Sequence, residues 1–279
     1  TFNGIDIVAH ALREKLGIQT PKIAGIAEKA LFADPPAAML EKLATALGLE
    51  FVGNYRPSPN ASDVTAELSA IKAAGAQIIM TFDNGPVGTV IAKQWGELQI
   101  PACLFGFSVF GSLGPHWDTT GGNCNYQAVW TWAGPAHITD KTIPYFERYS
   151  KEHPRALPDG GCSLYDQVIA VAAFIDAADS FDPDAIAAQI PKITVDGVQG
   201  HIRWSGRENV APHSFICGAE TVPSVYIQWR DGKAPVIWPD GRAPNPALKM
   251  GTGWEGFRYE GTKDYEIPPW VVEYWKGRS

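Results

Sequence analysis

The apolar positions in the first part of the chain alternate between two spacings. In residues 5–16 they recur at helical spacing and a glycine follows, which is typical of an amphipathic helix and its stop. Short runs of continuous apolar character stand at 22–27, 50–55, 77–82 and 101–105, and such runs predict strands that are covered on both faces. Helical spacing returns between the runs. The first half therefore predicts a repeated βαβ unit, which gives a parallel, doubly wound sheet of the α/β class.

The second half of the chain has a different pattern. Residues 142–153 and 163–180 predict helices, and the second is apolar on nearly every side, so we expect it to be buried. Strands are predicted at 126–132, 200–204, 225–229 and 236–238. Asp231-Gly232 is a typical turn for a hairpin between the last two of them. From Pro239 onward the chain is rich in Pro, Gly, Trp and charge, and we expect an irregular tail packed on the surface.

Composition and charge narrow the class of protein. The chain has 279 residues, of which 45% are hydrophobic and 19% charged, as in an ordinary globular protein. The net charge of −7, without a run of Lys or Arg, disfavours a nucleic-acid or anionic-membrane partner. No apolar run reaches the length of about 18 residues that a membrane span needs. The first residues do not resemble a signal peptide, which processing could have removed.

Motifs for common enzymes and metal sites are missing from the sequence. Neither type of glycine-rich phosphate loop occurs. Residues 106–111 depart from the GxSxG nucleophile elbow, because Phe110 stands where the second glycine is needed. The four cysteines form no CxxC pair and the six histidines no HxH or HxxxH pair. We therefore expect no catalytic residue, no metal and no cofactor, and the enzyme alternative is a doubly wound hydrolase or transferase that uses Ser108 or Asp83.

The residues at the ends of the predicted strands are the candidate ligand-binding set. In an open parallel sheet, small molecules bind beyond the carboxyl ends of the strands. The candidates at these ends are Phe32, Asp83, Asn84, Phe107 and Ser108, whereas Phe105 is interpreted as a core residue. Aromatic rings with one carboxylate and small polar groups suit a small organic ligand.

Six segments resemble, in the same order, those of the branched-chain amino-acid-binding family of type I periplasmic solute-binding proteins. They are 22–29 (KIAGIAEK), 61–75 (ASDVTAELSAIKAAG), 100–106 (IPACLFG), 164–175 (LYDQVIAVAAFI), 197–204 (GVQGHIRW) and the hairpin at 225–239. The resemblance covers roughly residues 5–239. It implies the type I periplasmic-binding-protein fold, in which two α/β lobes close on a ligand like a trap.

The resemblance also implies a division of the chain. Residues 5–133 would form a complete second lobe, 134–225 the returning C-terminal part of the first lobe, and 226–279 the crossing back to the second lobe and the irregular tail. Family members have a further long stretch before this point that builds most of the first lobe. We therefore expect the first lobe to be incomplete in this chain.

In the second lobe, the positions that contact the ligand in the family align with residues of the candidate set. The aromatic side chain that covers the ligand aligns with Phe32, and a tyrosine after the third strand aligns near Asn84. The acidic residue that pairs with a ligand ammonium aligns with Ser108, so an ammonium would be buried without a partner unless Asp83 replaces that acid. Two ligand classes stay open: an amino acid held by Asp83, or an aliphatic or aromatic acid that lacks an ammonium.

The function implied is that of a monomeric, periplasmic solute-binding protein, not an enzyme. It would capture a small organic ligand for the membrane permease of an ABC importer. A ligand sensor of the same fold is the alternative. If the protein is periplasmic, Cys124 and Cys162 in their glycine-containing loops are the expected disulfide pair, and buried thiols are the other interpretation.

Overall fold

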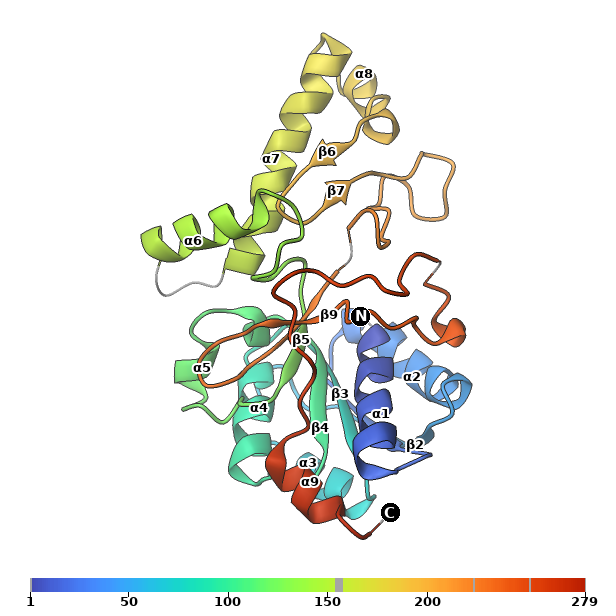
Figure 1. Cartoon of the computed structure of the whole chain (residues 1–279), viewed down its shortest axis with the longest axis vertical. Coiled ribbons are helices and arrows are strands. Elements are labelled where there is room, and N and C mark those ends of the chain that lie inside the picture. Colours follow the sequence, from blue (N-terminus) through green and yellow to red (C-terminus); the bar gives the residue numbers. More distant parts are fainter. Residues whose placement is uncertain (1, 154–157, 223, 251, 279) are drawn as a thin grey trace.

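The chain folds into an α/β body and a smaller arm that projects from one end of the body (Figure 1). The computed structural model describes residues 2–153, 158–222, 224–250 and 252–278. The body consists of the described residues of 2–133 and 224–278, and the arm of those of 134–222.

A seven-stranded sheet forms the centre of the body, with the strand order β2-β1-β3-β4-β5-β8-β9. The first five strands in this order run parallel: β1 (Lys22–Ala27), β2 (Glu50–Tyr55), β3 (Ile78–Asp83), β4 (Cys103–Ser108) and β5 (Ala128–Trp130). The hairpin of β8 (Tyr226–Gln228) and β9 (Val236–Trp238) adds two antiparallel strands beside β5. The predicted parallel sheet and the predicted hairpin are both confirmed.

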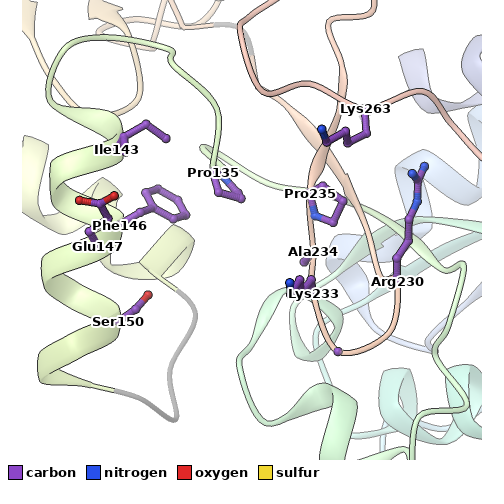
Figure 2. A pocket seen from close by; sticks show the side chains of 11 residues that line it. Pro135, Ile143, Phe146, Glu147, Ser150, Arg230, Lys233, Ala234, Pro235 and Lys263 are labelled. Carbon is purple, nitrogen blue, oxygen red and sulfur yellow. The ribbon is translucent and has the colours of Figure 1, made fainter.

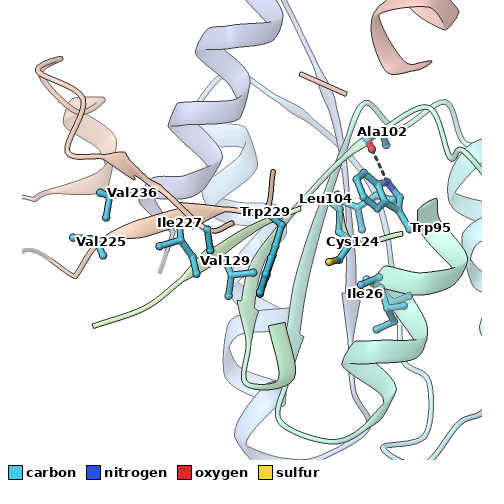
Figure 3. Packing of buried hydrophobic residues seen from close by; sticks show 14 of the residues in the cluster. Ile26, Trp95, Ala102, Leu104, Cys124, Val129, Val225, Ile227, Trp229 and Val236 are labelled. Carbon is cyan, nitrogen blue, oxygen red and sulfur yellow. Dashed lines mark hydrogen bonds between the residues drawn. The ribbon is translucent and has the colours of Figure 1, made fainter. Parts of the chain in front are cut away.

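Helices cover both faces of this sheet, as the βαβ repeat predicts. The side chains of α1 (Asn3–Leu16) and α2 (Asp34–Ala46) pack in one core with Ile23 and Met80. On the other face, α3 (Thr65–Ala73) and α4 (Val87–Glu97) pack in a core with Ile79 and Leu104 (Figure 3). In that core the indole N–H of the buried Trp95 donates a hydrogen bond of 2.8 Å to the carbonyl of Ala102. Alternate residues of one strand therefore serve two cores, which explains why the strands are apolar on both sides.

Strand β4 is longer at its carboxyl end than the sequence predicts. We expected it to end at Phe105, but hydrogen bonding to β3 continues to Ser108. The continuation depends on Gly106, whose φ of +145° is one that side chains rarely adopt. A Cβ at this position would lie 2.2 Å from the carbonyl oxygen of Thr81 on β3. Phe107 and Ser108 are consequently part of the sheet itself.

The arm has a small core of its own. It is built from α6 (Thr142–Glu152), α7 (Pro158–Ala178), α8 (Pro183–Ala187) and the short antiparallel pair β6 (Val195–Asp196) and β7 (His201–Ile202). The buried residues Phe174, Ile202 and Trp204 are in one cluster. The buried carboxylate of Asp166 on α7 accepts hydrogen bonds from the backbone N–H groups of Val198 (2.8 Å) and Gln199 (2.9 Å), which fixes α7 to the segment before β7.

The prediction that the apolar helix at 163–180 is buried is wrong. Leu164, Val168 and Val171 of α7 keep 68%, 71% and 52% of their surface exposed, because the arm elements that contact α7, namely α6, α8 and β6, leave these side chains uncovered (Figure 1). The stretch Gly161–Ala178 is also long and apolar enough to cross a membrane by length and composition, which the sequence analysis did not expect. The Asp166 contacts show instead that one face of the helix is packed against protein.

The C-terminal segment is more ordered than the predicted irregular tail. It ends in a helix, α9 (Pro269–Trp275), and contributes buried residues such as Trp254 and Val271 to the core that contains α1. The indole N–H groups of Trp270 and Trp275 donate to the carbonyls of Ile100 (3.0 Å) and Pro101 (2.6 Å), just before β4. The remaining elements are α5 (His116–Thr119) and short 3-10 helices at Leu31–Ala33, Phe110–Ser112, Ile190–Lys192 and Pro246–Leu248.

Candidate ligand-binding site

The carboxyl ends of the parallel strands bring four of the five candidate residues to one edge of the sheet. Asp83 is in register with Ser108, and Phe82 with Phe107, on β3 and β4. The 3-10 helix after β1 places the ring of Phe32 6.4 Å from that of Phe107. The fifth candidate, Asn84, follows β3 directly, and its side chain is exposed.

Asp83 and Ser108 are bound to each other and are closed off from solvent. Asp83 is 0% exposed and Ser108 2%. The Ser108 hydroxyl donates to Asp83 Oδ1 at 2.7 Å and accepts from the backbone N–H of Gly111 at 3.2 Å. Gly88 on α4 lies so close that a Cβ there would be 1.9 Å from Asp83 Oδ1. The two polar groups therefore lie behind the surface of the sheet edge.

The protonation of Asp83 follows from this enclosure. Burial disfavours its carboxylate and raises the pKa to about 7, although the hydrogen bond from Ser108 opposes the shift. The second carboxyl oxygen, Oδ2, has no hydrogen-bond partner among the described residues. A carboxyl group with a pKa of about 7 is partly protonated at neutral pH, so it is a weak anchor for a ligand cation.

Glu28, which the sequence analysis did not single out, shapes the loop beside Asp83. Its carboxylate accepts from the backbone N–H groups of Asn84 (3.1 Å) and Gly85 (2.6 Å), and only 3% of the residue is exposed. Its position directly after β1 was the available sequence signal, because that position meets the end of β3 in a parallel sheet. Glu28 thus positions the backbone at the site.

A row of aromatic side chains runs along the same edge. Ring centroids are separated by 5.7 Å between Phe32 and Phe82, 5.0 Å between Phe82 and Phe107, and 5.7 Å between Phe107 and Trp130 on β5. Trp132, 4.7 Å from Trp130, continues the row toward the arm. Only Phe32 and Phe107 of this row were predicted from the sequence, because Trp130 is the last residue of β5 and Trp132 follows outside the strand.

A cavity of about 360 Å³ adjoins the row at Trp130 and Trp132. Its other walls include Met250 and Trp254 from the C-terminal segment, and the exposed Lys249 is at its side. The indole N–H of Trp130 has no hydrogen-bond partner among the described residues. The cavity therefore combines indole and thioether surface with one cationic side chain.

A larger cavity of about 760 Å³ lies elsewhere, between α6 and the β8–β9 hairpin (Figure 2). None of the five candidate residues lines it. Its walls include Phe146 on α6 and Pro235 on the hairpin. It is therefore separate from the sheet edge.

The structure gives no arrangement that supports hydrolysis or metal binding in the part of the chain it describes. The Ser108 hydroxyl is bound to Asp83 and not to a histidine. The buried His116 shares a hydrogen bond of 2.8 Å with Gln127, and burial lowers its pKa, so it is neutral and structural. No group of three or more His, Cys, Asp or Glu residues among the described ones could hold a metal ion.

The four cysteines are thiols in the structure. Cys124 and Cys162, the expected pair in an oxidising compartment, are both buried in the core that contains α4, and they form no disulfide. Burial raises the pKa of Cys103 to about 12 and that of Cys124 to about 11, so both are protonated and unreactive at neutral pH.

Comparison with known proteins identifies the family to which the chain belongs. The family model described as periplasmic binding protein matches residues 2–217. A Silicibacter pomeroyi structure, provisionally assigned as a branched-chain amino acid ABC transporter, is similar with a TM-score of 0.69 and 17% identity, over 96% of this chain and 66% of that one. A search of curated proteins gives no match.

The descriptions of two further solved structures name a ligand. A leucine binding protein from Thermotoga maritima has a TM-score of 0.67 at 18% identity, over 88% of this chain and 66% of that one. A solute binding protein from R. palustris in complex with benzoate has a TM-score of 0.66 at 12% identity, over 84% of this chain and 62% of that one. At such identities the likeness shows the fold alone. This chain spans about two thirds of the length of these structures or slightly less.

Proposed function

Because the chain belongs to the periplasmic binding protein family, we propose that it captures a small organic acid outside the cytoplasm and delivers it to the membrane permease of an ABC importer. Proteins of this family bind solutes and are not enzymes. In this proposal the protein works as a monomer. Residues 5–133 act as the second lobe, 134–225 as the returning part of the first lobe, and 226–279 as the crossing back.

The aromatic row is the observation that carries the proposal. Phe32, Phe107 and Trp130 lie along the carboxyl edge of a parallel sheet, which is where such folds bind ligands. Phe32 is 40% exposed and is the ring most accessible to a ligand. Flat apolar surface of this kind suits a ring or an aliphatic chain, because aromatic pairs add roughly 0.5–1.5 kcal/mol beyond the burial of their area.

The state of Asp83 favours an acid without an ammonium over an amino acid. Its carboxyl is fully buried, its Oδ1 is bound by Ser108, and its pKa is raised to about 7. Ser108 itself carries no charge. An ammonium at this edge would lose its hydration without gaining a full negative partner, which is costly. The exposed Lys249, at the cavity beside Trp130, would bind the carboxylate of the ligand.

The experiment compares benzoate and leucine as ligands by saturation-transfer NMR, which detects weak binding. We expect benzoate to bind and leucine not to. Phe32→Ala should weaken benzoate binding about tenfold, because the ring that covers the ligand is lost. The variant should fold normally, since the side chain is substantially exposed.

Phe181→Ala is the matched control for this experiment. Phe181 is 85% exposed at the far end of the arm, so the same change there should leave benzoate binding unaltered. Preference for leucine, or an equal effect of both variants, would contradict the proposed ligand class. A leucine signal that disappears in Asp83→Asn would assign the site to amino acids held by Asp83.

A further inference from the structure

The large cavity lies where the arm meets the body (Figure 2). On the arm side its wall is α6, with Ile143, Phe146 and Glu147, and on the body side it is the β8–β9 hairpin, with Lys233, Ala234 and Pro235. Its volume of about 760 Å³ falls within the range of roughly 300–1,000 Å³ that is usual for small-molecule sites. A molecule in it would touch two parts of the fold at once.

The charged groups at this cavity are mostly cationic. Lys233, Lys263 and Arg230 are on the body side, and Glu147 on α6 is the one acidic residue in the described lining. Arg230 is already held, since it forms an ion pair of 2.9 Å with Glu266. No ion pair within 4.0 Å engages Lys233 or Lys263 among the described residues. Two ammonium groups are thus available to an anion.

The rest of the wall is apolar. The side chains of Pro135, Ile143, Phe146 and Pro235 face the space between α6 and the hairpin (Figure 2). Phe146 is only 8% exposed, and it joins this wall to the core that contains α4. Covering an apolar wall with an apolar group of a ligand is favourable, because it removes the wall from water. A ligand that fits both features carries one anionic group on an apolar chain or ring.

We propose that this cavity is a second binding site, distinct from the sheet edge, for an amphipathic carboxylate. Lys233 and Lys263 bind the carboxylate, and the apolar wall formed with α6 binds the chain. Because the site has one wall on the arm and one on the body, its ligand binds best to one relative arrangement of the two.

The test uses sodium octanoate as the probe, measured by isothermal titration calorimetry and by NMR. We expect octanoate to bind the whole chain. The double variant Lys233→Gln/Lys263→Gln should bind octanoate about tenfold more weakly, because the two ammonium groups that pair with its carboxylate are lost. Both lysines are exposed, so the double variant should fold normally. Ile143→Glu, which puts a carboxylate into the apolar wall, should abolish binding.

Matched controls make each outcome decisive. Lys42→Gln/Lys72→Gln removes the same charge from exposed positions on α2 and α3 and should leave octanoate binding unchanged. Phe32→Ala should leave unchanged the part of octanoate binding that depends on Lys233 and Lys263. Loss of that part in Phe32→Ala would place the probe at the sheet edge and overturn the proposal. If 1-octanol binds as tightly as octanoate, the proposal that the ligand of this site is an anion is wrong. Absence of octanoate binding by the unaltered chain would overturn the site itself.

Discussion

At the residue scale, Asp83 and Ser108 show where inference from the sequence reached its limit. Their strand-end positions predicted that they meet, and they do, in register and joined by a hydrogen bond of 2.7 Å. The enclosure by Gly88 on α4 could not be predicted, because it depends on how closely a helix packs on the sheet. The strand-end position of Asp83 predicts a ligand contact, which stays a prediction. The packing adds that the carboxyl group is closed off from solvent in this structure.

The stability of the protein should depend on pH through Asp83. This carboxyl has an ordinary pKa of 3.8, and burial raises its pKa to about 7 in the folded protein. Between about pH 4 and about pH 7 the folded protein holds a proton that the unfolded chain has released. The contribution of this group to the free energy of unfolding therefore falls as the pH rises through that window.

Asp83→Asn should remove this dependence. Relative to the unaltered protein, the variant should gain about 2–4 kcal/mol in the free energy of unfolding between pH 4 and pH 8, because the amide does not ionise. Urea unfolding at both pH values measures the difference. Asp118→Asn changes an exposed aspartate and should show no such gain. Parallel pH profiles for Asp83→Asn and the unaltered protein would be evidence against the raised pKa.

Gly106 is the residue on which the length of β4 depends. Gly106→Ala should lower the free energy of unfolding by several kcal/mol, roughly 2–4, because a Cβ would collide with the Thr81 carbonyl in addition to the strained φ. Gly17→Ala is the control: its φ of +71° is also positive, but nothing lies within 4 Å. It should cost only about 1 kcal/mol. Thermal unfolding compares the two, and equal losses would show that the contact with β3 is unimportant.

At the scale of elements, the strands and helices of the body follow the apolar pattern closely, and α7 does not. Strands β1 and β2 begin and end where the sequence predicts. Only β1 is buried over most of its length, whereas β2 is an edge strand whose residues are half-buried or exposed. The apolar residues of α7 predicted burial, yet half of that pattern faces outward. The apolar composition of a helix does not identify which of its faces meets another element, so the exposed face of α7 could not be predicted.

The two faces of α7 should respond differently to substitution. Val168 is 71% exposed, so Val168→Lys should change the free energy of unfolding by less than about 0.5 kcal/mol. Phe174 on the packed face is 6% exposed, and Phe174→Ala should cost about 3–5 kcal/mol. Urea unfolding measures both. Binding of the dye ANS should fall in Val168→Lys, and a large loss of stability in this variant would indicate that the outer face is covered after all.

At the scale of the whole molecule, the body and the arm have unequal cores. The sheet of the body lies between two large clusters of buried side chains, whereas the arm has one small cluster and a sheet of two very short strands. The division that the family resemblance implies, into 5–133, 134–225 and 226–279, stays a prediction. The aromatic row that runs from Phe107 through Trp130 to Trp132 could not be predicted, because it joins residues of β4 and β5 with the entry to the arm.

Native-state hydrogen exchange should separate the two parts. The backbone amides of β6 and β7 should exchange through an opening of lower free energy than those of β1, β3 and β4, since fewer buried contacts hold them. Mass spectrometry of exchanged peptides at increasing urea concentration measures both openings. A common opening free energy, equal to that of global unfolding, would mean that the arm and the body unfold as one unit.

The order of strands in the sheet has a consequence for folding. Strands β8 and β9 pair beside β5, but the whole arm lies between β5 and β8 in the chain. Until residues 226–238 pair beside it, β5 is an unprotected edge, and its unpaired N–H and C=O groups can pair with another unfolded chain. The long segment that forms the arm thus separates the exposure of that edge from its closure, and during this interval the folding chain is most prone to aggregation.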